Sequence, residues 1–155
     1  MTPPKGAPAG MAPGLVEALA QLSFLVHDAL AEVAGRHGLS IIQTRLLGAL
    51  RGRQPTMNAL GRQLGLDKSS IGGLVDRAQR RDLVTRTVSA TDRRAFQVSI
   101  TDTGRQLADQ VAAEFGERVE SYLASLPGAD RRLLAQLAAR IVAADADRRG
   151  SAGLR

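Results

Sequence analysis

Two groups of cationic and hydroxylic side chains in the sequence have the chemistry of nucleic-acid recognition. The first comprises Lys68, Ser69 and Ser70, with Arg77 further along the same segment. The second is the sequence Asp92-Arg93-Arg94, which lies among turn-forming residues. Lysine and arginine bind phosphates and guanine edges, and serine hydroxyls bind bases or phosphates. The alternative for the two serines is support of a helix N-terminus.

The positive charge of the chain is concentrated in the region that holds both groups. Residues 51–105 contain eleven basic and five acidic residues, whereas the rest of the chain holds ten of each, so the whole net charge of +6 falls in this region. A localised positive field attracts a polyanion, because each neutralised phosphate releases condensed counterions. A basic surface kept for solubility is the alternative, but such charge would more often be spread along the chain. We therefore expect double-stranded DNA as a partner.

The elements that would position these groups are a helix and a β-hairpin. Apolar residues recur at three- and four-residue intervals through Ile71, Leu74 and Ala78, which predicts a helix. From Phe96 to Ile100 apolar residues alternate with others, which predicts a strand after the basic turn. A helix followed by a hairpin with a basic tip is the shape of a winged helix that binds DNA.

Capping residues divide the segment before this helix into shorter helices. Ser40 and Gln43 have the spacing of a capping box. Thr56 is expected to cap a short helix and Asp67 the next one, after a tight turn at Gly65. A short helix, a glycine-containing turn and a second helix form the helix-turn-helix arrangement.

Long amphipathic helices are predicted on both sides of this region, at about 14–36 and 102–147. The second segment is capped by Thr101 or Asp102 and is interrupted at Pro127-Gly128. They could pack on one another as a monomeric bundle, but their apolar stripes are wide for so small a domain, which favours a symmetric homodimer. The expected fold is mainly α with a small β-hairpin wing: one domain at 14–147, with the winged helix-turn-helix at about 40–101. Segments 1–13 and 148–155 are expected to be a disordered and a frayed tail.

Several functional classes are disfavoured by what the sequence lacks. It has no cysteine, no metal-ligand spacing, no phosphate-binding glycine loop and no activated-nucleophile motif, so we expect neither an enzyme nor a metal or cofactor site. No apolar run has the length of a membrane span, and the first residues have no signal-peptide core. A cytoplasmic protein without a membrane partner is the default expectation.

Two stretches resemble the MarR family of bacterial winged-helix transcription regulators. They are MNALGRQLGLDKSSIGGLVDRAQRRDLVTR and TDRRAFQVSITDTG; by motif the resemblance covers about Ser40 to Arg105, and by order of elements the whole chain. It implies a homodimeric repressor of a pseudo-palindromic operator, released by a small aromatic or phenolic ligand. An architectural or ligand-independent DNA-binding protein and a winged-helix protein-interaction subunit are the alternatives.

The resemblance also implies roles for residues of the wing. Arg94 would enter the minor groove with its guanidinium held by Asp92, and a narrow A·T-rich groove does attract arginine. Arg86, the arginine of the LVxR motif, would contact a phosphate or brace the wing. In the alternative, Arg94 pairs structurally with Asp92 or Asp76 and Arg93 touches the DNA. The expected DNA-binding set is Lys68, Ser69, Ser70, Gly73, Arg77, Arg86, Arg93 and Arg94.

Two glycines inside the predicted recognition helix, Gly72 and Gly73, cost roughly 1 kcal/mol each relative to alanine. Close approach to DNA and tight packing against a neighbouring helix explain them equally well.

A ligand pocket of the family type would lie between the dimerisation helices and the winged region, lined by the first, second and fifth helices. His27, His37 and Arg45 are its polar candidates, although a lone histidine is more often a surface or structural residue. The lack of cysteine argues against sensing by thiol oxidation.

Overall fold

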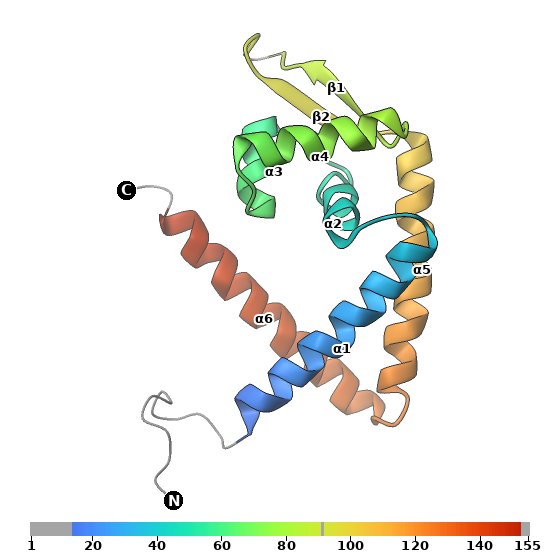
Figure 1. Cartoon of the computed structure of the whole chain (residues 1–155). Helices are drawn as coiled ribbons and strands as arrows, with labels where there is room; N and C mark the ends of the chain where they lie inside the picture. The colour runs from blue at the N-terminus through green and yellow to red at the C-terminus, as the bar shows by residue number, and fades with distance from the viewer. Residues whose placement is uncertain (1–13, 91, 153–155) are drawn as a thin grey trace, which may run out of the picture. The chain divides into compact units, whose positions relative to one another are not determined.

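The computed structural model describes residues 14–90 and 92–152, so the predicted tail at 1–13 lies outside it. Within the described residues the chain is mainly helical, with one antiparallel hairpin (Figure 1). The elements are α1 Leu15–Arg36, α2 Ile41–Ala49, α3 Met57–Leu64, α4 Lys68–Arg80, β1 Val84–Val88, β2 Phe96–Ile100, α5 Asp102–Leu123 and α6 Gly128–Ala152. The chain divides into two compact units, Met1–Glu117 and Arg118–Arg155, and the boundary between them falls within α5.

The predicted capping residues begin the helices as expected. The Ser40 hydroxyl accepts from the Gln43 amide while the Gln43 side chain accepts from the Ser40 amide, which confirms the capping box. Thr56 accepts from the Ala59 amide at 3.2 Å and Asp67 from the Ser70 amide at 2.7 Å. Such bonds satisfy amides that lack a partner in the first helical turn. They place α3 and α4 as the two helices of a helix-turn-helix.

The hairpin is attached to the helix-turn-helix by main-chain hydrogen bonds. Its two strands pair from Val84 opposite Ile100 to Val88 opposite Phe96. The Val98 amide donates to the Pro55 carbonyl at 3.0 Å, in the loop just before α3. Val84 and Val98 are buried, so one face of the hairpin packs on the core. The wing is therefore fixed at its base to the helices beside it.

The core of Met1–Glu117 is built mainly from leucine and valine, with some alanine and one isoleucine. Its buried residues come from α1 to α5 and both strands. The largest fully buried side chains are Leu46, Leu47, Leu50, Leu60, Leu74, Val33, Val75, Val84, Val98 and Val111. Burial of an aliphatic side chain of this size stabilises the fold by about 1.5–3 kcal/mol. The helix-turn-helix is thus an integral part of the core.

The junction between α4, β1 and α5 is unusually close. The Leu83 amide donates to the Ala78 carbonyl at 3.0 Å, and the Leu83 carbonyl accepts from the Thr101 amide at 3.1 Å. The Thr101 hydroxyl accepts from the Gly104 amide at 2.9 Å, so Thr101 rather than Asp102 caps α5. A Cβ on Gly104 would lie 2.9 Å from the Leu83 carbonyl carbon and nearer still to its oxygen. Only glycine fits at this contact.

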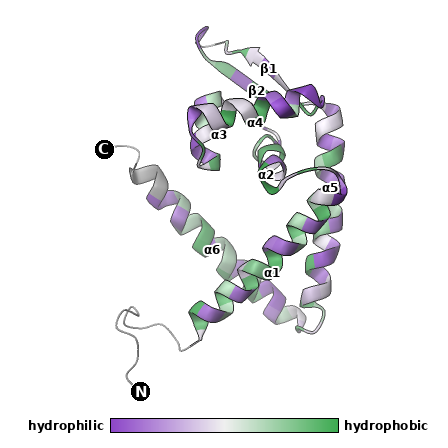
Figure 2. Ribbon diagram, viewed as in Figure 1, coloured by the Kyte–Doolittle hydropathy of each residue, from purple (hydrophilic) through white to green (hydrophobic). Residues whose placement is uncertain are grey.

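Hydrophobic residues occur along both α1 and α6 (Figure 2). Several of the large ones are exposed to solvent on each helix. The exposed large residues are Leu15, Val16, Leu19, Leu22, Phe24 and Leu25 on α1, and Leu133, Leu137, Ile141 and Val142 on α6. The last helix begins at Gly128 and continues to Ala152, into the segment expected to fray. Among the described helices, none combines the length and the apolar character needed to cross a bilayer.

Candidate nucleic-acid interface

The two faces of α4 divide its residues as the sequence predicted. Ile71, Leu74, Val75 and Ala78 are buried in the core. Lys68, Ser69, Ser70 and Arg77 are exposed, and Gly73 is half-buried.

Part of the role of Ser70 is structural. Hydrogen bonds from its backbone amide, and then from its side chain, lower the pKa of the Asp67 carboxyl that caps α4. The capping explanation of the serines thus applies to Ser70. Its exposed position at the start of α4 still leaves it on the solvent face beside Lys68 and Ser69.

The wing tip is closed by Asp92, which bonds to main chain. Its carboxylate accepts from the Arg94 backbone amide at 2.9 Å, and its carbonyl accepts from the Ala95 amide at 2.9 Å. The Asp92 amide donates to the hydroxyl of the buried Ser89 at 3.4 Å. Asp92 thus holds the Arg94 backbone in the turn, and the implied bond to the Arg94 guanidinium stays a prediction. Arg93 and Arg94 are both exposed at this tip.

Arg86 braces the wing against the recognition helix. Its Nη2 donates to Asp76 Oδ1 at 2.6 Å and to the Gly72 carbonyl at 3.2 Å, and its side chain is 26% exposed. Among the described side chains, its Nε is a buried group without a hydrogen-bond partner. Asp76, one of the structural partners considered for Arg94, is thus paired with Arg86. Of the two roles expected for Arg86, this geometry favours bracing.

Several hollows are lined by residues of α4, and the two with the largest volumes lie beside its exposed residues. The larger, about 720 Å³, lies between α3, α4 and the wing, and Lys68, Gly72, Arg86, Asp92 and Arg94 are among its lining residues. The smaller, about 420 Å³, lies on the other side and is lined in part by Ser69, Ser70, Gly73 and Arg77.

Sequence reasoning missed Arg62, which lines the larger hollow together with Lys68 and Arg94. These three cations come from α3, α4 and the wing. The basic character of Arg62 near the end of α3 was visible in the sequence, but its orientation toward the wing depends on how α3 packs. Below, the larger hollow with its lining residues is called the wing cleft.

Gly72 faces open space. A Cβ built on it would have no neighbour within 4 Å, and one on Gly73 would meet only the Arg77 guanidinium, at 3.2 Å. Packing against a neighbouring helix therefore does not explain these glycines. Close approach of DNA to the helix backbone at these two glycines stays a prediction.

Replacing Gly72 with alanine should raise the free energy of unfolding by up to about 1 kcal/mol, because alanine is the better helix former. The same change should weaken binding to duplex DNA if the backbone approaches the duplex here. Urea denaturation and fluorescence anisotropy measure the two effects. Gly35→Ala in α1, which also has open space around its Cβ position, is the control that should change no DNA affinity. An unaltered affinity for Gly72→Ala would contradict close approach at this residue.

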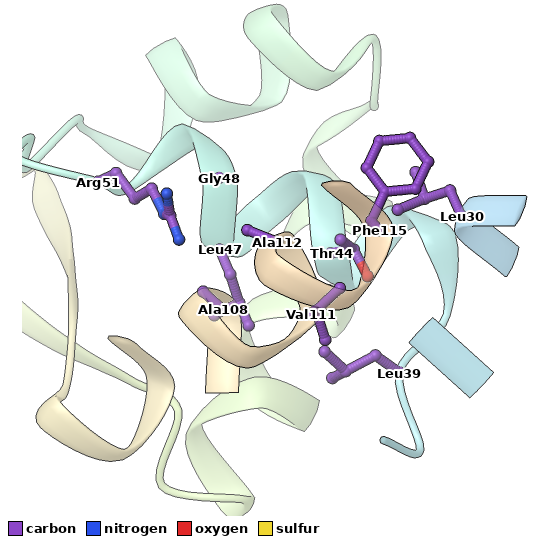
Figure 3. Close-up of a pocket in the computed structure, with 10 residues that line it drawn as sticks. All are labelled: Leu30, Leu39, Thr44, Leu47, Gly48, Arg51, Ala108, Val111, Ala112 and Phe115. Carbon is purple, nitrogen blue, oxygen red and sulfur yellow. The ribbon is translucent and has the colours of Figure 1, made fainter. Parts of the chain in front are cut away.

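A separate cavity of about 200 Å³ lies between α1, α2 and α5 (Figure 3). Its lining is Leu30, Leu39, Thr44, Leu47, Gly48, Arg51, Ala108, Val111, Ala112 and Phe115. Arg51 lies at one end, and Phe115 with Leu30 at the other. These are the three helices expected to line a ligand pocket, but the polar residues differ from those expected.

None of the three polar candidates lines this cavity. His27 and Arg45 are exposed on their helices, and His37 is bonded to Glu114. Thr44 and Arg51 are the polar residues of the cavity instead, and Arg51 forms an ion pair with Asp109 of α5. The correction arises because helical periodicity identifies the faces of α2 but not which face α5 covers.

His37 belongs to an ion-pair cluster that joins the end of α1 to α5. Its Nε2 lies 2.7 Å from Glu114 Oε1, and Arg36 Nη2 donates to Glu114 Oε2 at 3.0 Å. The hydrogen bond from His37 and the charges of His37 and Arg36 lower the pKa of the Glu114 carboxyl. A carboxyl with a lowered folded-state pKa stabilises the fold above its ordinary pKa, and this stabilisation is lost as pH falls through the folded-state value.

We therefore expect Glu114→Gln to reduce the loss of stability on acidification. The two proteins should differ in how their stability changes at pH values below the ordinary pKa of glutamate, about 4.3. There the wild-type carboxylate is protonated and its ion pair is lost, whereas the glutamine amide does not titrate. Urea midpoints measured from neutral pH to about pH 3 would show it as a shallower acid limb. Glu117→Gln, an exposed position on the same helix, is the control. Parallel acid limbs for wild type and Glu114→Gln would contradict the role of this carboxyl.

Residues 37–95 match the model of the MarR family. The winged-helix region of this chain is therefore similar to that of MarR-family proteins. The match ends at the wing turn and includes α2, α3, α4 and β1. No curated protein matched the chain significantly.

Solved structures of MarR-family regulators share the fold over most of the chain. A mutant of MarR from E. coli has a TM-score of 0.73 at 19% identity, covering 85% of this chain and 98% of that one. CouR from Rhodococcus jostii, bound to p-coumaroyl-CoA, has a TM-score of 0.69 at 24% identity, with 86% and 95% covered. A MepR mutant from S. aureus, bound to an oligodeoxyribonucleotide, has a TM-score of 0.62 at 17% identity, with 83% and 96% covered. The fold is thus the MarR winged helix.

Proposed function

We propose that the protein is a homodimeric repressor that binds a pseudo-palindromic operator and leaves it when a small ligand binds. The observation that carries the proposal is the wing cleft, where Arg62, Lys68 and Arg94 converge beside the exposed face of α4. Three cations from three elements around one hollow match the charge of a phosphodiester backbone. The charge excess of residues 51–105 supports the same partner.

In this proposal α4 enters the major groove and the wing reaches the neighbouring minor groove. Lys68, Ser69, Ser70, Gly73 and Arg77 would face the bases and the phosphates beside them. Exposed Arg93 and Arg94 would meet the minor groove, with Asp92 holding the main chain of the turn. Arg86 would act through the wing, since it is already bonded to α4. The binding of the MepR mutant to an oligodeoxyribonucleotide supports this use of the fold.

The proposal assigns dimerisation to helices at about 14–36 and 102–147 and DNA binding to about 40–101. The exposed apolar side chains of α1 and of α6 support it, because each helix leaves a hydrophobic face to solvent in a single chain. A two-fold dimer would present two α4 helices to successive major-groove faces, about one helical turn apart. A palindromic operator then follows from the symmetry.

The ligand part of the proposal rests on the cavity between α1, α2 and α5. Its walls are aliphatic except for Phe115, Thr44 and Arg51. An aromatic carboxylate or phenolate would place its ring against the apolar wall and its charge near Arg51, in competition with Asp109. CouR, which was solved with p-coumaroyl-CoA bound, shows that a protein of this fold can hold a ligand with an aromatic acyl group.

Footprinting of the DNA that flanks the gene, repeated with a panel of aromatic acids, tests the proposal. We expect protection of a dyad whose half-sites lie roughly 10 bp apart, centre to centre, and its loss with at least one acid. Arg51→Gln, which keeps hydrogen bonding but removes the charge, should bind the same DNA and no longer respond to the acid.

Other footprints would favour other functions. Uniform protection without a preferred sequence would favour an architectural DNA-binding protein. If a dyad is protected and no acid relieves the protection, the proposal of an operator-binding regulator would stand and that of an aromatic ligand would be rejected.

A further inference from the structure

The outer end of the wing carries two exposed apolar residues that lie side by side on the paired strands. Val88 ends β1 and Phe96 begins β2, and the strand register pairs them directly. Val88 is 54% exposed and Phe96 is 50% exposed. Large apolar residues at solvent on a small hairpin favour strand association and aggregation, so their position calls for a partner.

Strand alternation places this pair on the inner face of the hairpin. Val84, Arg86 and Val88 share one face of β1, and residues paired across an antiparallel ladder point to the same side. Val84 is buried in the core, and Arg86 is bonded to α4. Val88 and Phe96 therefore extend the core-facing side of the hairpin beyond its last contact with α4. Phe96 lines the wing cleft.

The wing cleft combines this apolar wall with cations. Arg62, Lys68 and Arg94 line it together with Phe96 and Met57. Its acidic residues are engaged: Asp76 pairs with Arg86, and Asp92 accepts from the Arg94 amide. A DNA strand alternates phosphates with deoxyribose rings, whose carbon faces are apolar. Cations beside an exposed aromatic ring match both parts of that repeat.

We propose that Phe96, flanked by Val88 on the paired strand, packs on the deoxyribose face of a DNA strand seated in the wing cleft. The contact is non-ionic and positions the strand for the cations around it. This inference rests on the proposed function, because it needs duplex DNA as the occupant. It adds two residues, Phe96 and Val88, that charge and sequence motifs did not identify.

Salt dependence separates such a contact from an ionic one. A duplex selected from a random pool by the wild-type protein is the probe, and its affinity is measured by anisotropy over a range of salt concentrations. Phe96→Ala should weaken binding about tenfold, from the apolar area of half a phenylalanine side chain. The slope against log salt should stay that of wild type, since no phosphate contact is lost. Phe96→Leu, which keeps an apolar side chain, should weaken binding less than Phe96→Ala does.

Thr85→Ala is the matched control, since Thr85 is exposed on the opposite face of the same hairpin and should leave affinity unchanged. Circular dichroism and thermal melting of each variant establish that the hairpin is intact. Unchanged affinity for folded Phe96→Ala, with wild type binding the duplex, would overturn this inference alone. A reduced slope would also overturn it, because Phe96 would then act by positioning an arginine. If wild type selects and binds no duplex, the proposed function fails as well.

Discussion

Gly104→Ala is expected to lower the free energy of unfolding by about 3 kcal/mol or more, enough to unfold many small domains. The added Cβ would overlap the Leu83 carbonyl and press on Ile100 Cγ1 at 3.0 Å. Main chain cannot rotate away as a long side chain can, so the start of α5 would have to move. That movement would break the bond from the Thr101 amide to Leu83. Urea denaturation measures the loss.

Gly116→Ala in the same helix provides the contrast. A Cβ on Gly116 would meet nothing within 4 Å, so alanine should raise stability by up to about 1 kcal/mol through helix propensity. The two substitutions are chemically identical and differ only in their surroundings. Equal effects on stability would show that the close contact of Gly104 with Leu83 is not a constraint on folding.

Arg94→Ala is expected to weaken binding to the proposed operator by about five- to 150-fold, from about 1–3 kcal/mol of lost interaction. Arg94 is exposed at the wing tip, lines the wing cleft, and has its backbone amide fixed by Asp92. A guanidinium presented from a rigid turn loses less freedom on binding than one from a mobile loop. The slope of log affinity against log salt should fall by about one.

Arg93→Ala in the same turn is the comparison for this experiment. Both arginines are exposed, and the geometry of the turn does not by itself rank them. A larger loss for Arg93→Ala would exchange the two roles and support Arg93 as the residue in the minor groove. If both variants keep the wild-type affinity and the wild-type slope of log affinity against log salt, the wing tip does not take part in DNA binding. Thermal melting identifies any variant that is unfolded.

Local features of the fold could be predicted because their causes lie within a few residues. The bonds of Ser40, Thr56 and Asp67 all reach three residues along the chain, so residue type and spacing determine them. The buried face of α4 follows in the same way from its apolar period. The exposed positions of Lys68 and Arg77 could be deduced from that face.

The remaining features depend on contacts between distant parts of the chain. The sequence motif gives no reason for Gly104, whose close neighbour is Leu83 in another element. His37 was predicted as a ligand contact, but its partner is Glu114, 77 residues away. Arg51 lines the cavity because α5 lies over one particular face of α2.

The brace formed by Arg86 sets the separation between the two elements proposed to read DNA. One guanidinium joins β1 to both Gly72 and Asp76 in the middle of α4, so it holds the wing at a set distance from the helix. A duplex whose grooves do not match this distance would have to change its groove width or bend. The energy of that adjustment depends on base sequence. Selectivity would then extend to base pairs that no side chain touches, and stiff or flexible steps between the two contacts would strengthen or weaken an operator.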